Sequence, residues 1–128
     1  MSLASILWVD DEIEILEAHK LFLEMKGYHV TSMTNGFDAL EFLQKQSVDL
    51  ILLDESMPGM SGLEMLQRIK RMHPHIPVVL VTKNETESLM EEAIGAQITD
   101  YLIKPVNPNQ VLLILKKNLD NKRLITES

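Results

Sequence analysis

Apolar residues occur along this chain in two alternating patterns. Short runs of four or five consecutive apolar residues are each followed by a longer segment in which apolar residues recur every three or four positions. Short continuous runs are typical of strands covered on both faces, and the longer spacing is typical of amphipathic helices. The predicted strands are residues 5–9, 28–33, 50–53, 77–82 and 101–103, and the predicted helices are residues 13–26, 36–45, 61–72, 84–94 and 107–119.

Residues at the ends of these segments support the predicted helices. Asn35, Ser61 (with Glu64 three residues later), Asn84 (with Glu87) and Asn107 (with Pro108 next) are suited to helix starts, and Gly27 is suited to a helix stop. In the first helix the expected buried stripe is Ile15, Leu16, Ala18, Phe22, Leu23 and Met25.

Five successive strand–helix units indicate an α/β fold with a parallel sheet and helices on both faces. A length of 128 residues suits one domain. We expect residues 1–120 to form that domain, and the polar residues 121–128 to be a tail or the start of a linker. The chain is therefore expected to be a fragment or a trimmed protein.

Composition narrows the function classes. The chain has no cysteine, which excludes disulfide and thiolate chemistry, and no apolar run long enough to cross a bilayer. Its formal net charge of −7 makes direct binding to nucleic acid unfavourable.

Candidate chemistry lies where the predicted strands end. Asp10 and Asp11 follow the first strand, Asp54 the third, Thr82 ends the fourth, and Lys104 follows the fifth. In an open parallel sheet, ligands bind outside the carboxyl ends of the strands, so these side chains are expected to meet. Three carboxylates together suit Mg²⁺. A carboxylate beside a metal, a lysine and a hydroxyl is suited to accepting a phosphoryl group.

These motifs together resemble the receiver domains of bacterial two-component response regulators. The resemblance rests on Asp10-Asp11-Glu12, the run Asp54 to Gly62, Thr82, and the run Tyr101 to Pro105, and it spans nearly the whole chain. It implies a flavodoxin-like doubly wound sheet with the strand order 2-1-3-4-5, as in the family member that serves as a standard example of this order. It also implies a cytoplasmic signalling domain that is not an enzyme acting on a separate substrate, and whose partner is a sensor histidine kinase or a phosphotransfer protein.

The resemblance also implies residue roles. Asp54 would be the phosphoacceptor; Asp11, Asp54 and the backbone carbonyl of Ser56 would bind Mg²⁺, with Asp10 acting largely through water. Lys104 would pair with the phosphoryl group, Thr82 and Tyr101 would form the switch pair, and the Lys104–Pro105 bond would be cis. A narrower resemblance, to PorX-type regulators, rests on Val81 to Lys83, Met90 to Gly95 and Asp100 to Gln110. It implies an effector domain of the alkaline-phosphatase superfamily that is absent from this chain.

Two positions depart from the usual family pattern. Lys83 replaces the small residue that commonly follows the switch threonine. It is predicted either to narrow access to Asp54 and slow phosphorylation by small donors, or to add a positive charge for the phosphoryl group. Gln97 stands where the family commonly has the glycine of a Gly-Ala pair, so the end of the fourth helix is expected to be reshaped.

The last helix is apolar on every side from Val111 to Leu115. This pattern indicates either a helix enclosed by its neighbours or a dimer surface on the fourth and fifth helices. Opposite charges support the dimer, because Glu85, Glu87, Glu91 and Glu92 lie on the fourth helix and Lys116, Lys117, Lys122 and Arg123 lie at or beyond the end of the fifth.

Three function classes remain at the level of sequence. The first is a phosphorylation switch, and the second is a phosphate-independent interaction module on the same fold. The third is an aspartyl-phosphate phosphatase or transferase. It is disfavoured because such an enzyme normally needs an acid two residues after the nucleophile, where this chain has Ser56.

Overall fold

The computed structural model describes residues 4–83 and 86–120. Strands and helices alternate throughout, as predicted. The strands are β1 (Ser5–Val9), β2 (His29–Met33), β3 (Leu50–Asp54), β4 (Val78–Thr82) and β5 (Asp100–Ile103). The helices are α1 (Ile13–Met25), α2 (Gly36–Lys45), α3 (Gly62–Met72), α4 (Glu87–Gly95) and α5 (Pro108–Leu115), the last followed by a π-helical segment η1 (Lys116–Asp120).

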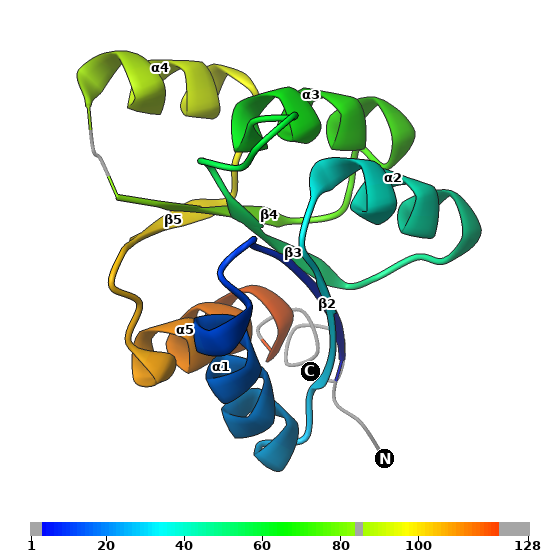
Figure 1. The fold of residues 1–128 in the computed structure, drawn as a ribbon, viewed down its shortest axis with the longest axis vertical. Coiled ribbons are helices and arrows are strands. Elements are labelled where there is room, and N and C mark those ends of the chain that lie inside the picture. Colours follow the sequence, from blue (N-terminus) through cyan, green and yellow to red (C-terminus); the bar gives the residue numbers. More distant parts are fainter. Residues whose placement is uncertain (1–3, 84–85, 121–128) are drawn as a thin grey trace.

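All five strands are parallel and lie in the order β2-β1-β3-β4-β5. The predicted flavodoxin-like order is therefore confirmed. Figure 1 shows three layers: α1 and α5 cover one face of the sheet, and α2, α3 and α4 cover the other. β1, β3 and β4 are the inner strands, which explains why their sequences are apolar at nearly every position.

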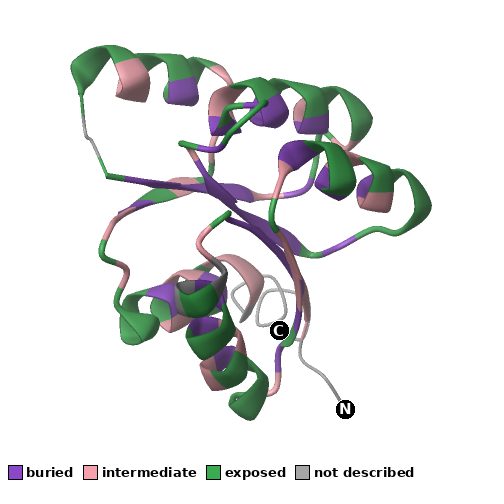
Figure 2. Cartoon of the chain, in the orientation of Figure 1, coloured by how far each residue is buried: buried purple, intermediate pink, exposed green. Residues whose placement is uncertain are grey.

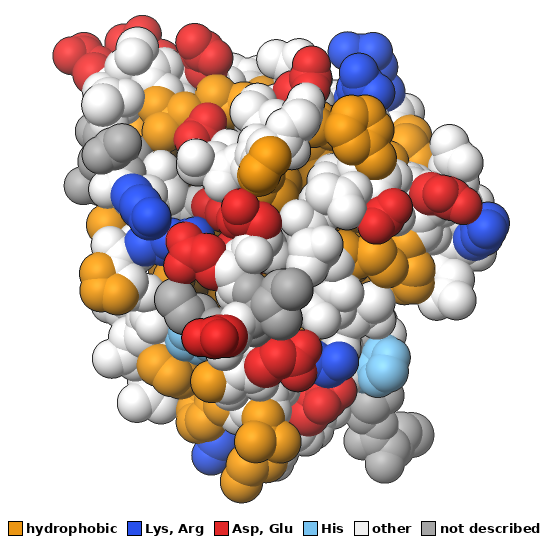
Figure 3. Space-filling model, viewed as in Figure 1, with side chains coloured by type: hydrophobic (Ala, Val, Ile, Leu, Met, Phe, Trp, Pro, Cys, Tyr) orange, Lys and Arg blue, Asp and Glu red, His pale blue; other side chains and the backbone are white. Residues whose placement is uncertain are grey.

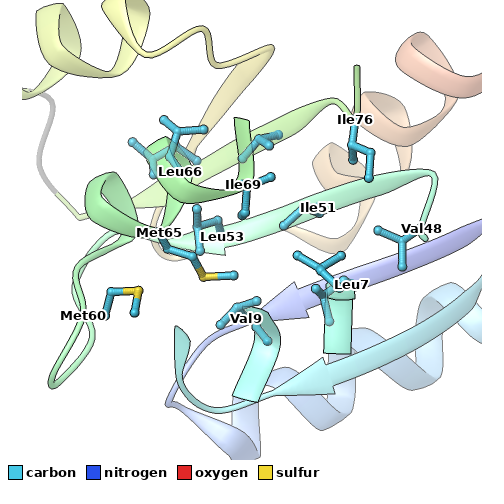
Figure 4. Close-up of a cluster of buried hydrophobic side chains, with 14 of the residues drawn as sticks. Leu7, Val9, Val48, Ile51, Leu53, Met60, Met65, Leu66, Ile69 and Ile76 are labelled. Carbon is cyan, nitrogen blue, oxygen red and sulfur yellow. The ribbon is translucent and has the colours of Figure 1, made fainter. Parts of the chain in front are cut away.

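Alternate residues of each inner strand contribute to two separate cores. Leu7, Val9, Ile51 and Leu53 pack against α2 and α3 together with Met65 and Ile69, as Figure 4 shows. Ile6, Trp8, Leu50 and Leu52 face the opposite way and pack with residues of α1 and α5. Figure 2 shows the result as a buried central sheet between helices whose outer surfaces are exposed.

Most helix starts follow the predicted capping residues. The side chains of Asn35, Ser61 and Asn107 each accept a hydrogen bond from a backbone N–H of the first helical turn. The expected start of the fourth helix at Asn84 is wrong, because α4 begins at Glu87 with Thr86 as its cap. Asn84 itself lies outside the described residues.

The predicted stripe of the first helix is wrong in two of its members. Leu16 and Leu23 are buried, but Ala18 is exposed and Met25 is 77% exposed; the Ile15 side chain lies outside the part that the structure describes. The buried line instead runs through His19, which is three residues after Leu16 and four before Leu23.

Two helices end in the same hydrogen-bonded motif with different residues at its critical position. After α1, Gly27 N–H binds Glu24 O and Tyr28 N–H binds Leu23 O, with Gly27 at φ 99°. After α4, Gln97 N–H binds Ile94 O and Ile98 N–H binds Ala93 O, with Gln97 at φ 68°. Both are Schellman motifs, in which glycine is the favoured left-handed residue. The structure thus places the unusual Gln97 in the turn that ends α4.

Candidate functional site

The predicted site residues meet because of strand register and side-chain alternation. Val9 is paired with Leu53 in the sheet, so the next residues, Asp10 and Asp54, stand side by side at the end of β1 and β3. Trp8 and Leu52 belong to the core on the α1 and α5 side. Two residues further along, Asp10 and Asp54 fall on that same side by the period of a strand.

Three of the predicted carboxylates form one cluster. Asp10, Asp11 and Asp54 each offer an oxygen, and these oxygens all lie within 4.8 Å of one another. Asp10 and Asp54 are buried, at 6% and 2% exposure, whereas Asp11 is exposed. The cluster is thus open to solvent on the side of Asp11.

Lys104 lies between the two buried carboxylates. Its Nζ atom is 3.2 Å from Asp54 Oδ1 and 3.2 Å from Asp10 Oδ2. It reaches this position from the segment after β5, directly before the cis Lys104–Pro105 bond that the resemblance implied. One ammonium group therefore faces two carboxylates within the protein interior.

This arrangement shifts the pKa values of Asp54 and Lys104. Burial, followed by the charge of Asp10, raises the pKa of Asp54 to about 6, against the opposing effect of Lys104. Burial lowers the pKa of Lys104, but the carboxylates of Asp10 and Asp54 outweigh it and the net shift is upward. Lys104 therefore stays protonated, and Asp54 carries a partly uncompensated negative charge near neutral pH.

Short loops fix the two buried carboxylates. Asp10 Oδ1 accepts a hydrogen bond of 2.9 Å from Glu12 N–H, and Asp54 Oδ1 accepts one of 3.4 Å from Ser56 N–H. Gly62 begins α3 so close to β3 that a Cβ atom there would collide with the carbonyl oxygen of Asp54. The glycine thereby allows the start of α3 to lie directly against the backbone at the end of β3.

Lys83 lies at the mouth of the site and forms part of a charged bridge. Glu12 Oε1 is 3.6 Å from Lys83 Nζ and 3.4 Å from Lys104 Nζ. These two lysines, chiefly Lys104, lower the pKa of Glu12. Loops after three different strands are therefore connected through one carboxylate.

The remaining predicted residues lie at different depths. Thr82 is buried at the end of β4, beside the start of the loop that carries Lys83. Ser56 is exposed and follows Asp54 by two residues. Tyr101 lies near the start of β5 with 37% exposure, outside the carboxylate cluster. The structure thus brings together Asp10, Asp11, Asp54, Thr82, Lys83 and Lys104, and leaves Tyr101 on the outer surface.

Sequence reasoning missed the roles of Glu12 and His19. Glu12 was part of the acidic motif but had no assigned contact. His19 is buried, with its ring centroid 5.2 Å from that of Trp8. The spacing of Leu16, His19 and Leu23 on one helix face was the available signal for its burial.

The carboxylate cluster fits a small hard cation. Its donors are all carboxylate oxygens, its members are close enough to share one ion, and Asp11 leaves a route for water molecules that would complete the coordination. The structure also contains the repulsion that an ion would relieve, because a single ammonium group faces Asp10 and Asp54 together.

Comparisons with known proteins agree on one family. The family described as "Response regulator receiver domain" matches residues 6–116. The transcriptional regulatory protein ZraR of Klebsiella oxytoca is 37% identical over 119 residues, covering 93% of this chain but 27% of its own length.

Solved structures give the same result. A CheY-like response regulator receiver domain protein from Methanospirillum hungatei superposes with a TM-score of 0.90 at 31% identity, over 95% of this chain and 98% of its own. NtrX from Brucella abortus superposes with a TM-score of 0.86 at 28% identity, covering 99% of this chain and 29% of its own. The chain spans roughly a quarter to a half of the length of the curated relatives it matches. Among the described residues, no helix is long and apolar enough to cross a membrane.

Proposed function

Because this chain belongs to the response regulator receiver domain family, we propose that Asp54 accepts a phosphoryl group from a sensor histidine kinase or a phosphotransfer protein. The observation that carries the proposal is the position of Asp54 at the end of β3, within 3.2 Å of Lys104 and beside Asp10 and Asp11. A nucleophilic carboxylate needs nearby positive charge when it meets an anionic phosphoryl group, and this geometry supplies it.

In the proposed reaction, a carboxylate oxygen of Asp54 forms a bond to phosphorus. The bond between phosphorus and the donor nitrogen breaks, and the donor keeps that electron pair. Lys104 would move its ammonium group from the Asp54 carboxylate to an oxygen of the bound phosphoryl group, 3.2 Å being its present distance from the nucleophile. Asp10, Asp11, Asp54 and the Ser56 carbonyl would hold Mg²⁺, which neutralises charge on the phosphoryl oxygens when bound.

The proposed switch begins at Thr82. This residue is buried at the end of β4, next to the strand that carries Asp54, so its hydroxyl is suited to turn toward a phosphoryl group there. Tyr101 lies on the adjacent strand β5, with 37% of its surface exposed. An inward rotation of Tyr101 would therefore bury additional aromatic surface and change the face formed by α4, β5 and α5.

That face is the proposed output surface, for dimerisation or for control of an effector domain. It exposes Ile94, Tyr101 and Leu113 from three consecutive elements. Figure 3 shows acidic side chains gathered over α4, at the top left of the view. Lys117 lies 3.7 Å from Asp100, so part of the predicted charge complementarity is already satisfied within one chain. Most of the affinity of a dimer would therefore come from the apolar residues.

We infer that residues 1–120 are one receiver domain, which acts in the cytoplasm on an effector domain joined to or bound by it. The much greater length of relatives such as ZraR supports an effector in a longer protein. The PorX-type effector remains a prediction from sequence. The domain would catalyse only its own phosphorylation and dephosphorylation, rather than turnover of a separate substrate.

Intact-protein mass after incubation with acetyl phosphate and Mg²⁺ tests this function. The expected result is one added phosphoryl group, absent in the Asp54→Ala variant and absent without Mg²⁺. A full yield of adduct in Asp54→Ala would show that another residue is modified. No adduct in the unmodified chain, even with Lys83→Ala, would favour the phosphate-independent interaction module.

A further inference from the structure

The strand β5 forms one edge of the sheet. It is the last strand in the order, and among the described residues only β4 pairs with it. A groove of about 540 Å³ is lined by all four residues of β5, by Lys104 and Pro105, and by Gln110 of α5. Since neighbouring side chains of a strand point to opposite faces, a groove that touches all four residues lies along the edge. The outer edge of β5 is therefore within reach of another polypeptide segment.

The backbone groups of alternate residues in β5 point to that outer edge. Lys104 N–H, directly after the strand, donates to the carbonyl oxygen of Thr82 in β4. By the alternation of a strand, Leu102 also faces β4, whereas Tyr101 and Ile103 direct their N–H and C=O groups outward. An outward row of such groups is a template for pairing with another strand.

The side chain of Asp100 occupies the first position in this row. Its Oδ1 atom accepts a hydrogen bond of 2.8 Å from the N–H of Tyr101. Its Oδ2 atom lies 3.7 Å from Nζ of Lys117 in η1. The lysine is 70% exposed, so this ion pair contributes little, and the hydrogen bond to a charged acceptor carries most of the effect. A carbonyl group from another strand would have to displace a carboxylate to reach Tyr101.

We propose that Asp100 closes the outer edge of β5 to backbone pairing with a second copy of this chain. A second copy is the matching occupant because its own β5 presents the same outward groups, on Tyr101 and Ile103, and two such edges pair antiparallel about a two-fold axis. Both Asp100 side chains would then have to leave their hydrogen bonds. Contact between copies at this face is therefore left to exposed side chains such as Ile94 and Leu113. The closure is independent of the phosphorylation proposed above.

The test is sedimentation of the unphosphorylated chain, without Mg²⁺, over a series of protein concentrations. Asp100→Ala should dimerise with a dissociation constant at least about tenfold below that of the unmodified chain, because the competing hydrogen bond is lost. Asp100→Asn keeps a side-chain oxygen that can accept from Tyr101 N–H, so it should dimerise less than Asp100→Ala. Glu17→Ala removes one negative charge from the exposed side of α1 and is the matched control, expected to behave as the unmodified chain does. Equal dimerisation of Asp100→Ala and Asp100→Asn would assign the effect to charge and overturn the proposal.

Amide hydrogen exchange locates the contact. In Asp100→Ala, the Tyr101 amide should exchange about tenfold faster than in the unmodified chain at low concentration, and should be protected again where the dimer forms. The opposite edge provides a comparison, because His29 and Met33 bond to β1 and its neighbour, which leaves the Ser32 amide facing outward. Protection of Ser32 instead of Tyr101, or a variant that stays as monomeric as the unmodified chain, would overturn the proposal. Asp100→Val replaces the alanine variant if that does not fold, since valine favours strands.

Discussion

The Nζ atom of Lys83 lies 3.6 Å from Oε1 of Glu12, so the loop after β4 is joined to the loop after β1 across the mouth of the site. The same Glu12 oxygen is 3.4 Å from Lys104. A donor that approaches Asp54 from this side must pass the bridge or displace it. Substitution of Lys83 therefore tests whether the bridge controls access to Asp54.

Lys83→Ala should speed phosphorylation by acetyl phosphate. Exposed ion pairs contribute about 0–1 kcal/mol, so removing this one should raise the rate by at most about fivefold. The measurement is the initial rate of mass increase with saturating Mg²⁺.

Lys45→Ala is the matched control for this change. Lys45 also forms a 3.6 Å pair, with Glu41, and is similarly exposed, but it lies at the end of α2 away from the site. Its removal should leave the rate unchanged. A slower rate in Lys83→Ala alone would mean that the lysine attracts the anionic donor more than it obstructs it.

Asp54→Asn should stabilise the metal-free protein. The pKa of Asp54 is raised in the fold from its ordinary value of 3.8 to about 6, so ionised Asp54 opposes folding at neutral pH. Two pH units correspond to about 3 kcal/mol, and we expect about half of this because Asp54→Asn also removes the ion pair with Lys104. The gain should be present above pH 6 and should disappear as the pH falls toward 4. Urea unfolding at several pH values measures it.

The effect of Mg²⁺ on the free energy of unfolding tests the proposed metal site. Binding to the folded state alone raises the free energy of unfolding with metal concentration, so the unmodified chain should gain stability and Asp54→Asn should gain much less. Equal stabilisation of both chains would place the metal elsewhere. Asp38→Asn, at an exposed carboxylate on α2, should behave as the unmodified chain does.

The sequence predicted the fold and most of the site for physical reasons. Continuous apolar runs such as Leu50 to Leu53 are typical of central strands in a parallel sheet. The polar residue after each run then lies at the carboxyl end of its strand, where the carboxyl ends of all the strands meet. Register completes the prediction, because adjacent strands that end together bring Asp10 next to Asp54. Capping residues such as Ser61 were equally informative, since their side chains accept local hydrogen bonds that do not depend on tertiary packing.

Predictions from the sequence failed where tertiary packing determines which residues are buried and which side chains meet. Met25 is apolar and has helical spacing, yet it faces solvent, whereas the polar His19 is buried against Trp8. The bridge from Glu12 to two lysines connects residues more than seventy positions apart, so no local pattern marks it. The start of α4 was misplaced because Asn84 and Thr86 both have capping side chains, and the choice between them depends on the loop geometry.

Leu113→Asp should weaken a phosphorylation-dependent dimer. Leu113 is 66% exposed on α5, within the proposed face formed by α4, β5 and α5, and a charge there would have to be desolvated in an apolar interface. Analytical ultracentrifugation with and without beryllofluoride, a mimic of the phosphoryl group, measures the effect. We expect the dissociation constant to rise at least about tenfold.

Leu21→Asp is the control for dimerisation, because Leu21 is 63% exposed on α1, on a different face. It should dimerise normally. A chain that remains monomeric with beryllofluoride at high concentration would contradict the proposed dimer, and equal weakening by both variants would place the interface outside the face formed by α4, β5 and α5.

His19→Leu should reduce the loss of stability in mild acid. Burial lowers the pKa of His19 below its ordinary value of 6.5, and Asp10 opposes this only in part. A lowered histidine pKa stabilises the fold above 6.5, and that contribution is lost as the pH falls toward the folded value. His19 lines a cavity beside the carboxylate cluster, and the charged residues that line the same cavity are Asp10, Glu12, Lys83 and Lys104.

Thermal unfolding between pH 7.5 and about 5 measures the effect. The difference in stability between the unmodified chain and His19→Leu should therefore grow as the pH falls below 6.5. Parallel curves would contradict a buried neutral histidine, and His75→Leu, at an exposed histidine, is the control.

Gln97→Gly should stabilise the protein, although glycine substitutions usually do the reverse. Gln97 has φ 68° in the turn that ends α4, a left-handed conformation that costs a residue with a Cβ atom about 1 kcal/mol and costs glycine almost nothing. The equivalent turn after α1 already uses Gly27. We expect a gain of about 0.5–1 kcal/mol in the free energy of unfolding, measured with urea.

Gln67→Gly, at an exposed position inside α3, should instead lose about 1 kcal/mol. Losses of similar size in both variants would mean that Gln97 does not adopt the left-handed conformation in solution.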